Sequence, residues 1–229
     1  MKCAVIGLGE FGRPLALKLA SQGAEVIAVD ANMDIIDDVK NDVSLAVKLD
    51  ATDEKDLRSQ GIDKVDVLIA AMGGSFEANA LVVVLAKQLG VPRVIARATN
   101  NTHARILKLI GADEIIQPEE TSAELLAHRL LFSALKNYFE LIPGYSIMEI
   151  EVFKKLVGKT LAEILPRQKS NVNCIAIKKR HQIGLDSDKF HETINIVPKG
   201  SDVLENGDIV ALTGADKDIA QFFEETGVK

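Results

Sequence analysis

The chain has 229 residues, of which 47% are hydrophobic and 26% are charged, and its formal net charge is −6. This length and apolar content can supply one large core or two modest ones. The acidic balance argues against nucleic-acid binding, which needs clustered lysine and arginine, and no apolar run approaches the roughly 18 residues that span a bilayer. Two distant cysteines, Cys3 and Cys174, fit neither a disulfide framework nor a metal site. We therefore expect a cytosolic globular protein with no nucleic-acid partner and no direct membrane insertion.

The strongest motif lies in the first 30 residues. An apolar run leads into residues 7–12, G-L-G-E-F-G, and a helical pattern follows. In this arrangement Gly7 allows a tight turn, Gly9 leaves room for a pyrophosphate, and Gly12 lets the helix pack closely on the strand. A second apolar strand ends on Asp30 about 20 residues further on, where ribose hydroxyls need an acceptor. The pattern predicts a Rossmann-type nucleotide site.

Up to about residue 120, short apolar runs alternate with longer amphipathic runs, which predicts a doubly wound parallel sheet of the α/β class. The expected strands lie near 2–7, 25–30, 44–49, 66–71, 93–97 and 113–116. The expected helices lie near 12–22, 33–41, 53–60, 76–89 and 102–110. In such a sheet the ligand binds beyond the carboxyl ends of the strands, at the switch point between the first and the fourth strand.

Small and polar residues follow the ends of these strands. Asn32 and the turn at 50–52 are expected beside an adenine, while glycines at 73–74 let the backbone approach a phosphate. Asp50 also fits a turn or a helix N-cap, and Arg97 suits either a phosphate or a carboxylate partner. The predicted nucleotide-binding residues are Gly7, Gly9, Glu10, Phe11, Gly12, Arg13, Asp30, Asn32, Asp50, Ala51, Thr52, Ala71, Met72, Gly73 and Arg97.

The pattern changes after residue 120. Residues 121–124, T-S-A-E, read as a capping box, and apolar residues including Leu126, Leu130 and Phe139 follow at helical spacing. This apolar surface is too broad for one domain face, so the sequence predicts a hinge and dimerisation helix over 121–143, stopped by a Pro-Gly pair.

The last third of the chain has a different hydrophobic pattern, in which apolar and polar residues alternate strictly at 145–152. Further strands are expected at 173–178, 194–197 and 208–213, with helices at 160–165 and 216–225. The sequence thus predicts a nucleotide-binding domain over 1–120, the hinge helix, and a small α+β domain over 144–229.

With these parts placed, the chain resembles the regulatory subunits of Ktr/Trk-type potassium uptake systems, which are built from RCK (regulator of potassium conductance) domains. The resemblance covers essentially the whole chain. It is carried by residues 5–12, Val29-Asp30, 50–52, 96–98, 110–113, 116–119, 198–200, 204–210 and 212–214.

The resemblance implies a non-catalytic sensor that binds AMP, ADP, ATP or NAD(H). It also implies a homodimer formed through the hinge helix, assembly into an octameric ring, and a potassium-conducting membrane protein as partner at the cytoplasmic face. Glu119 matches an acidic position that holds a divalent cation in some members. Glu10 departs from the family, because an arginine that contacts the outermost phosphate is usual there. Whether the second domain binds cyclic di-AMP stays open.

Two alternatives remain at this point. The nucleotide-binding half would equally serve an NAD(P)-dependent oxidoreductase. However, the four histidines, His103, His128, His181 and His191, form no pattern with a nucleophile or a general acid. A nucleotide-binding regulator of another transporter would differ from the main interpretation in its partner alone.

Overall fold

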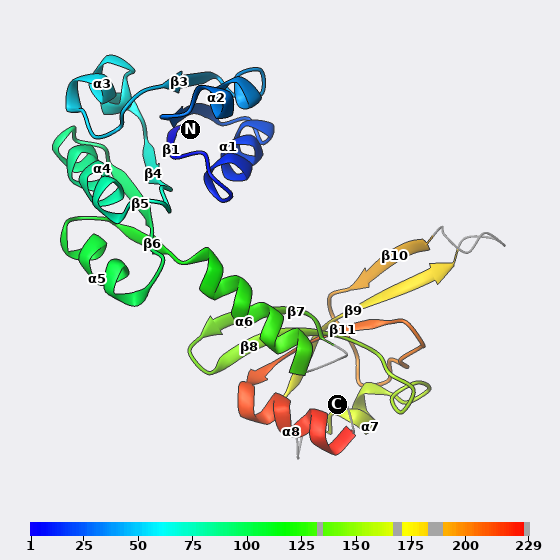
Figure 1. Ribbon diagram of the computed structural model, residues 1–229. Coiled ribbons are helices and arrows are strands. Elements are labelled where there is room, and N and C mark those ends of the chain that lie inside the picture. Colours follow the sequence, from blue (N-terminus) through cyan, green and yellow to red (C-terminus); the bar gives the residue numbers. More distant parts are fainter. Residues whose placement is uncertain (132–134, 167–170, 183–189, 227–229) are drawn as a thin grey trace. The chain divides into compact units, whose positions relative to one another are not determined.

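The computed structural model of the chain describes residues 1–131, 135–166, 171–182 and 190–226 (Figure 1). It divides into two compact units, Met1–Thr121 and Ser122–Lys229, each built on its own sheet. Among the helices that are described, none is long and apolar enough to cross a membrane.

The first unit is a six-stranded parallel sheet in the order β3-β2-β1-β4-β5-β6. Its strands are β1 (Lys2–Ile6), β2 (Glu25–Asp30), β3 (Leu45–Lys48), β4 (Val67–Ala70), β5 (Arg93–Arg97) and β6 (Glu114–Ile116). Its helices are α1 (Gly12–Ser21), α2 (Met33–Val39), α3 (Glu54–Ser59), the short 3-10 turn η1 (Ile62–Lys64), α4 (Phe76–Gln88) and α5 (Asn101–Leu109). The predicted elements of this half and their doubly wound order are confirmed.

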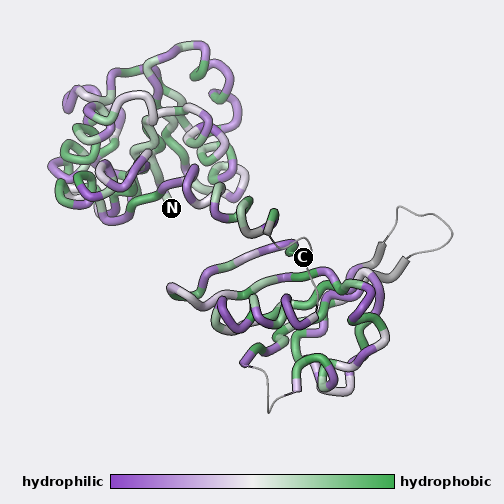
Figure 2. Tube along the Cα trace, turned by 60° about the horizontal axis from the view of Figure 1, so that its bottom comes forward, coloured by the Kyte–Doolittle hydropathy of each residue, from purple (hydrophilic) through white to green (hydrophobic). Residues whose placement is uncertain are grey.

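Both faces of the first sheet are buried. Ala4 and Ile6 of β1 pack in a cluster with α3, α4 and α5, whereas Cys3 and Val5 pack in a second cluster with α1 and α2. Successive residues of a strand point to opposite faces, so a strand covered on both sides must be apolar at every position. Figure 2 shows this as hydrophobic strands at the centre of the unit, with hydrophilic segments around them.

The second unit is a five-stranded antiparallel sheet in the order β10-β9-β11-β8-β7. Its elements are β7 (Leu135–Ile142), β8 (Tyr145–Glu151), α7 (Leu161–Ile164), β9 (Asn173–Gln182), β10 (Phe190–Asn195), β11 (Ile209–Ala215) and α8 (Asp216–Thr226). Met148 and Ile150 of β8 pack in one cluster with Ile219, Phe222 and Phe223 of α8. The predicted α+β class of this half is confirmed, although β10 ends at Asn195 and so covers only the first half of the strand expected at 194–197.

The prediction for the segment after residue 120 is partly wrong. The helix α6 spans Pro118–Leu131, so it begins three residues before the expected capping box and ends well before Phe139. Its start is explained by Pro118, whose fixed φ suits the first position of a helix; the N–H of Thr121 already bonds to the carbonyl of Gln117 at 3.0 Å.

Residues 135–142, expected in the helix, form the strand β7. The Pro-Gly pair that follows connects β7 to β8 as a hairpin turn, with Ile142 paired to Tyr145. Gly144 has φ of 82°, and proline followed by such a glycine is the sequence of a type II turn. Cross-strand pairing with β8 has overridden the helical spacing of the apolar residues in this stretch.

Candidate functional site

A cavity of about 430 Å³ lies at the carboxyl ends of the strands of the first unit. Since β2 and β4 flank β1 on opposite sides, this edge contains the switch point at which doubly wound sheets bind ligands. Nine predicted residues line the cavity, namely Gly7, Gly9, Asp30, Asp50, Ala51, Thr52, Ala71, Met72 and Gly73. The lining is completed by Ile6, Val29, Ala31, Leu49, Gly74, Ser75 and Ala78. The structure therefore brings together most of the site that the sequence predicted.

The glycine loop has the geometry expected of the three glycines of its motif. Gly7 has φ of +88°, and a Cβ on Gly12 would lie 1.9 Å from the carbonyl oxygen of Gly7. By contrast, a Cβ on Gly9 would meet nothing within 4 Å, which leaves open space beside the loop. The N-cap residue of α1, Phe11, provides no side-chain hydrogen bond to the helix. In the first turn of α1 the Arg13 N–H already donates to the Gly9 carbonyl at 3.1 Å, and Pro14 has no N–H. An anion at this end of α1 would therefore be met by the backbone N–H groups of the loop at 10–12.

Asp30 is held in place by two backbone groups. Its Oδ2 accepts from the N–H of Leu8 at 2.7 Å, and its Oδ1 accepts from the N–H of Asn32 at 2.9 Å. A carboxylate has about four acceptor sites, so Asp30 retains capacity for ribose hydroxyls. The contact to Leu8 also ties the end of β2 to the glycine loop.

Asp50 shapes the turn at the end of β3. Its Oδ1 accepts from the N–H of Thr52 at 2.9 Å and from the Thr52 hydroxyl at 2.6 Å, and these bonds lower the pKa of Asp50. The N-cap of the following helix is Asp53, which accepts from the N–H groups of Lys55 and Asp56. Of the two structural roles considered for Asp50, the turn is confirmed and the helix cap belongs to Asp53.

Several predicted residues lie outside the cavity lining. The Arg13 guanidinium pairs with Asp38 of α2, with Nη1 and Oδ2 3.0 Å apart. Asn32 accepts from the N–H of Asp34 and caps α2. Glu10 is exposed in the turn before α1, and Phe11 packs against the core cluster beneath α1 and α2. Arg13, Asn32 and Phe11 thus support the loop and its neighbouring helices.

Arg97 lies against the cavity from the end of β5. Its Nη1 would be 2.7 Å from a Cβ on Gly73, so the guanidinium fills the space that a side chain there would need. Its Nη2 donates to Oε1 of Glu119, and the Arg97 side chain is only 13% exposed. Of the two partners expected for Arg97, the structure contains the carboxylate.

Glu119 carries the candidate metal position. A hydrogen bond from its own backbone N–H, followed by the contact with Arg97, lowers the pKa of Glu119. Among the residues that the structure describes, no group of three or more histidine, cysteine or acidic side chains is placed to hold a metal ion. A divalent cation at Glu119 would have to compete with the Arg97 guanidinium.

Two residues of this region were missed in the sequence. Ser75 lines the cavity and caps α4 by accepting from the N–H of Ala78 at 3.2 Å. Asn79, 1% exposed, donates from Nδ2 to the carbonyl of Arg97 at 2.9 Å. Ser75 directly follows the glycine pair and precedes the helical pattern, which is an N-cap signal. Asn79 has no local signal, because its partner is 18 residues away.

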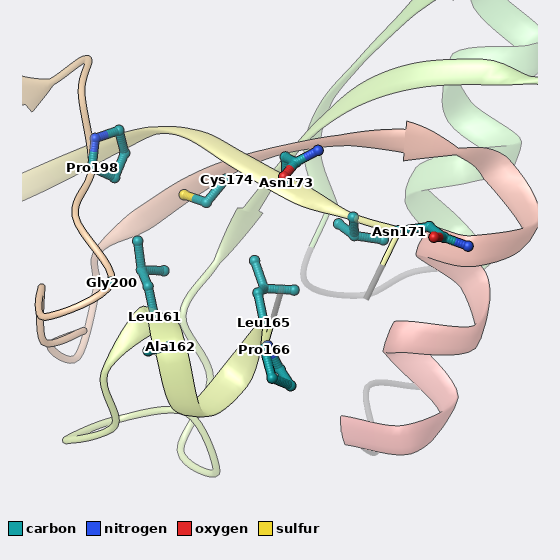
Figure 3. Close-up of a pocket in the computed structure, with 10 residues that line it drawn as sticks. Leu161, Ala162, Leu165, Pro166, Asn171, Asn173, Cys174, Pro198 and Gly200 are labelled. Carbon is teal, nitrogen blue, oxygen red and sulfur yellow. The ribbon is translucent and has the colours of Figure 1, made fainter. Parts of the chain in front are cut away.

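The second unit contains a larger hollow of about 910 Å³ between α7, β9 and the segment after β10 (Figure 3). Leu161, Leu165, Cys174 and Pro198 contribute much of its lining, and Figure 3 shows the Cys174 thiol pointing into it. Burial raises the pKa of this thiol to about 11. Cys174 is therefore a protonated, half-buried side chain at neutral pH.

The fold and the first cavity define a class: a Rossmann-type domain with a candidate nucleotide site, followed by a small α+β domain. Residues 3–118 match the family model of the TrkA-N domain, and residues 147–227 match that of the TrkA-C domain. The chain therefore belongs to the family of Ktr and Trk potassium uptake proteins built from TrkA-N and TrkA-C domains.

Relatives of known name support this membership. The chain is 33% identical over 219 residues to the Ktr system potassium uptake protein C of Bacillus subtilis (strain 168), which covers 96% of this chain and 94% of that protein. It is also 33% identical over 222 residues to the Ktr system potassium uptake protein A of the same organism, and this match covers 97% of this chain and 95% of that protein.

Solved structures share the fold. The crystal structure of the GsuK RCK domain has a TM-score of 0.54 and 22% identity, covering 99% of this chain and 46% of that chain. A GsuK channel bound to NAD has a TM-score of 0.52 and 21% identity, and the match covers 99% of this chain and 38% of that chain. These likenesses confirm the RCK-type fold that the resemblance implied.

Proposed function

We propose that this chain is a nucleotide-sensing regulatory subunit that controls a potassium-conducting membrane protein by changing conformation when it binds an adenine nucleotide or NAD(H). The observation that carries the proposal is the cavity at the switch point, where the glycine loop, the open end of α1 and Asp30 meet. Membership in a family of potassium uptake proteins supplies the class of partner. Ligand binding would then shift the population between two states of the subunit.

The charges of the cavity favour ligands with few phosphates. Its lining includes Asp30 and Asp50 and, among the described residues that form it, no lysine or arginine. Glu10 adds a carboxylate to the exposed turn beside the loop. Because like charges repel, we expect AMP, ADP or NAD(H) to bind at least as tightly as ATP when no divalent cation is present. A cation at Glu119 would reduce that repulsion and favour ATP.

The proposed role is not catalytic. The cavity lining contains, in the part that the structure describes, no histidine, lysine, cysteine or tyrosine to exchange a proton with a substrate. His103 stacks on Phe76 with ring centroids 4.0 Å apart, which is a packing role. The side chains of His128, His181 and His191 lie outside the described residues. A hydride-transfer reaction needs an acid or base beside the substrate oxygen that gains or loses a proton. The two carboxylates of the lining, Asp30 and Asp50, instead accept from backbone N–H groups and from Thr52 at the predicted ribose and adenine positions, which supports a sensor.

Calorimetric titration of the full chain with AMP, ADP, ATP, NAD⁺ and NADH tests the site directly. We expect Asp30→Ala to weaken binding by about 1–3 kcal/mol, the range for a hydrogen bond to a charged group. Asp34→Ala, which removes a nearby carboxylate of α2 outside the cavity, is the matched control. NADP⁺ should bind poorly, because its 2′-phosphate would meet Asp30. Equal affinities for wild type and a folded Asp30→Ala variant would contradict the assignment.

The assembly part of the proposal rests on exposed leucines of α6. Leu126 is 55% exposed and Leu130 is 76% exposed, and such apolar surface is typical of an interface. We propose that α6 contributes to a homodimer, that dimers assemble into an octameric ring, and that the ring lies on the cytoplasmic side of its membrane partner. Phe139, which the helical spacing predicts on the same helix, belongs to β7.

A double substitution tests this surface. Leu126→Glu with Leu130→Glu should produce a smaller species in light scattering, because charge would replace the apolar contact. Glu124→Lys, on the same helix but turned away from these leucines at 100° per residue, is the control and should keep the parent assembly. An unchanged mass for the double variant would contradict a dimer through α6.

A further inference from the structure

Arg97 occupies an unusual position between two parts of the first unit. Its Nη1 fills the space beside Gly73, a residue of the cavity lining, while its Nη2 donates to Glu119 in the first turn of α6. One guanidinium thus contacts both the wall of the candidate nucleotide site and the start of the helix that runs from the first unit into the second.

The guanidinium is incompletely satisfied where it lies. Its Nε is buried and has no hydrogen-bond partner within the described part of the chain. The backbone beside it is fixed, because the Arg97 carbonyl accepts from the buried Asn79 amide. A buried donor without a partner is unfavourable, so the arginine gains from any state that offers its guanidinium further acceptors.

The partner on the other side, Glu119, is exposed. Its side chain is 60% exposed, so water can solvate the Glu119 carboxylate when the ion pair opens, and the loss of Arg97 costs it little. A phosphate offers an arginine a planar, doubly hydrogen-bonded contact that is stronger than a neutral hydrogen bond. A phosphate bound beside Gly73 would therefore compete well with Glu119 for the guanidinium.

We propose that Arg97 and Glu119 form a ligand-sensitive link, in which a nucleotide phosphate takes the Arg97 guanidinium from Glu119 and releases the first turn of α6. This inference rests on the proposed nucleotide binding at the same cavity. Arg97 contacts the phosphate, whereas Glu119 is a positioning residue that acts through Arg97. The link gives ligand occupancy a direct effect on the segment that joins the two units.

The first experiment compares AMP with adenosine, which lacks the phosphate, in calorimetric titrations of the full chain with EDTA present. Glu119→Gln removes the competing charge at an exposed position, so AMP affinity should rise roughly twofold to fivefold while adenosine affinity stays constant. Glu120→Gln makes the same charge change at the next residue and should alter neither affinity. A purely structural role for Glu119 would leave the ratio of the two affinities unchanged.

The second experiment follows hydrogen exchange of the peptide that contains residues 118–122. In the wild type, saturating AMP should increase exchange in this first turn of α6, and adenosine should not. In Glu119→Gln, exchange should be high without ligand and should respond little to AMP.

The outcomes separate this inference from the proposed function. Absence of nucleotide binding by the wild type would overturn both. Wild-type binding together with an unchanged or lowered AMP affinity in Glu119→Gln would overturn the link alone. The same follows if AMP leaves exchange at 118–122 unaltered in the wild type.

Discussion

The two sheets of this chain bury their strands in different ways. In the first unit, β1 is buried at Cys3, Ala4, Val5 and Ile6 without interruption, because helices cover both faces of the sheet. In the second unit, β8 alternates between buried and half-buried residues, because α8 packs against one face.

This difference decides where function can lie on each unit. A sheet covered on both faces offers a ligand its edge, so its polar residues gather where the strands end. A sheet covered on one face keeps a second face for charged side chains. Lys178 and Glu149 pair across that face, with Nζ and Oε1 2.5 Å apart, and Lys136 pairs there with Glu151.

We expect the largest loss of stability from a substitution that blocks the close approach of the glycine loop to α1. Gly12→Val would force a side chain against the Gly7 carbonyl, 1.9 Å from the position of its Cβ, and we expect the first unit to lose its fold. Gly9→Val is the matched control, since a Cβ at Gly9 meets nothing within 4 Å.

The unfolding of the two units can be measured separately. The chain has no tryptophan and only two tyrosines, Tyr138 and Tyr145, both in the second unit. Tyrosine fluorescence therefore follows the second unit, while hydrogen exchange of β1 follows the first. Protected β1 amides in Gly12→Val would show that the close packing is dispensable.

A smaller effect distinguishes the two burial patterns. Ile150→Ala should cost about 2–5 kcal/mol of unfolding free energy, because it empties a fully buried position of β8. Ile147→Ala, on the other face of the same strand, should cost about 1 kcal/mol or less. Denaturant titration followed by tyrosine fluorescence measures both values.

The same test applied to β1 sharpens the comparison. Val5→Ala and Ile6→Ala lie on opposite faces, and both should cost more than about 1 kcal/mol, since each loses at least two buried methylene equivalents. Hydrogen exchange of β1 gives these values. A strong asymmetry between the two β1 variants would contradict a sheet buried on both faces.

The smallest effect concerns the open face of the second sheet. Burial opposes ionisation of Glu149, but Lys178 and the Asn137 amide outweigh it and lower its pKa from 4.5. Glu149 therefore stabilises the fold above its unfolded pKa, and this contribution is lost as pH falls through the lower folded pKa. Glu149→Gln should cost about 1 kcal/mol at pH 7 and progressively less in acid.

Glu151→Gln is the control for that prediction. Its partner Lys136 and the carboxylate are 45% and 43% exposed, so the pair should contribute less than about 0.5 kcal/mol. Tyrosine-detected unfolding at several pH values compares the two variants. A cost for Glu149→Gln that does not change with pH would show that packing, and not charge, explains it.

The two burial patterns also explain which strands could be predicted from the sequence. Continuous apolar runs and the glycine loop predicted β1, β2 and the cavity edge, because local residues decide those features. The strand β7 could not be predicted in this way, since Leu135, Tyr138, Phe139 and Ile142 are spaced as on a helix. Its state depends on pairing with β8, in which Tyr138 lies opposite Met148.

The site shows the same limit at the level of single side chains. Asp30 was predictable, because a strand end at a fixed distance from the glycine motif defines its place. The pairing of Arg97 with Glu119 joins residues 22 positions apart, and the sequence left the partner of Arg97 undecided. Arg97 is the last residue of β5 and Glu119 follows the end of the adjacent parallel strand β6, which is the one signal that could have joined them.

The joint between β6 and α6 has a mechanical consequence. The strand ends at Ile116 and the helix begins at Pro118, so Gln117 alone connects a sheet to a helix of 14 residues. At a rise of about 1.5 Å per residue such a helix is roughly 21 Å long, and a tilt of about 10° at its base moves its far end by roughly 4 Å. A short, stiff lever of this kind turns a small rearrangement at Glu119 into a displacement comparable to the width of a side chain.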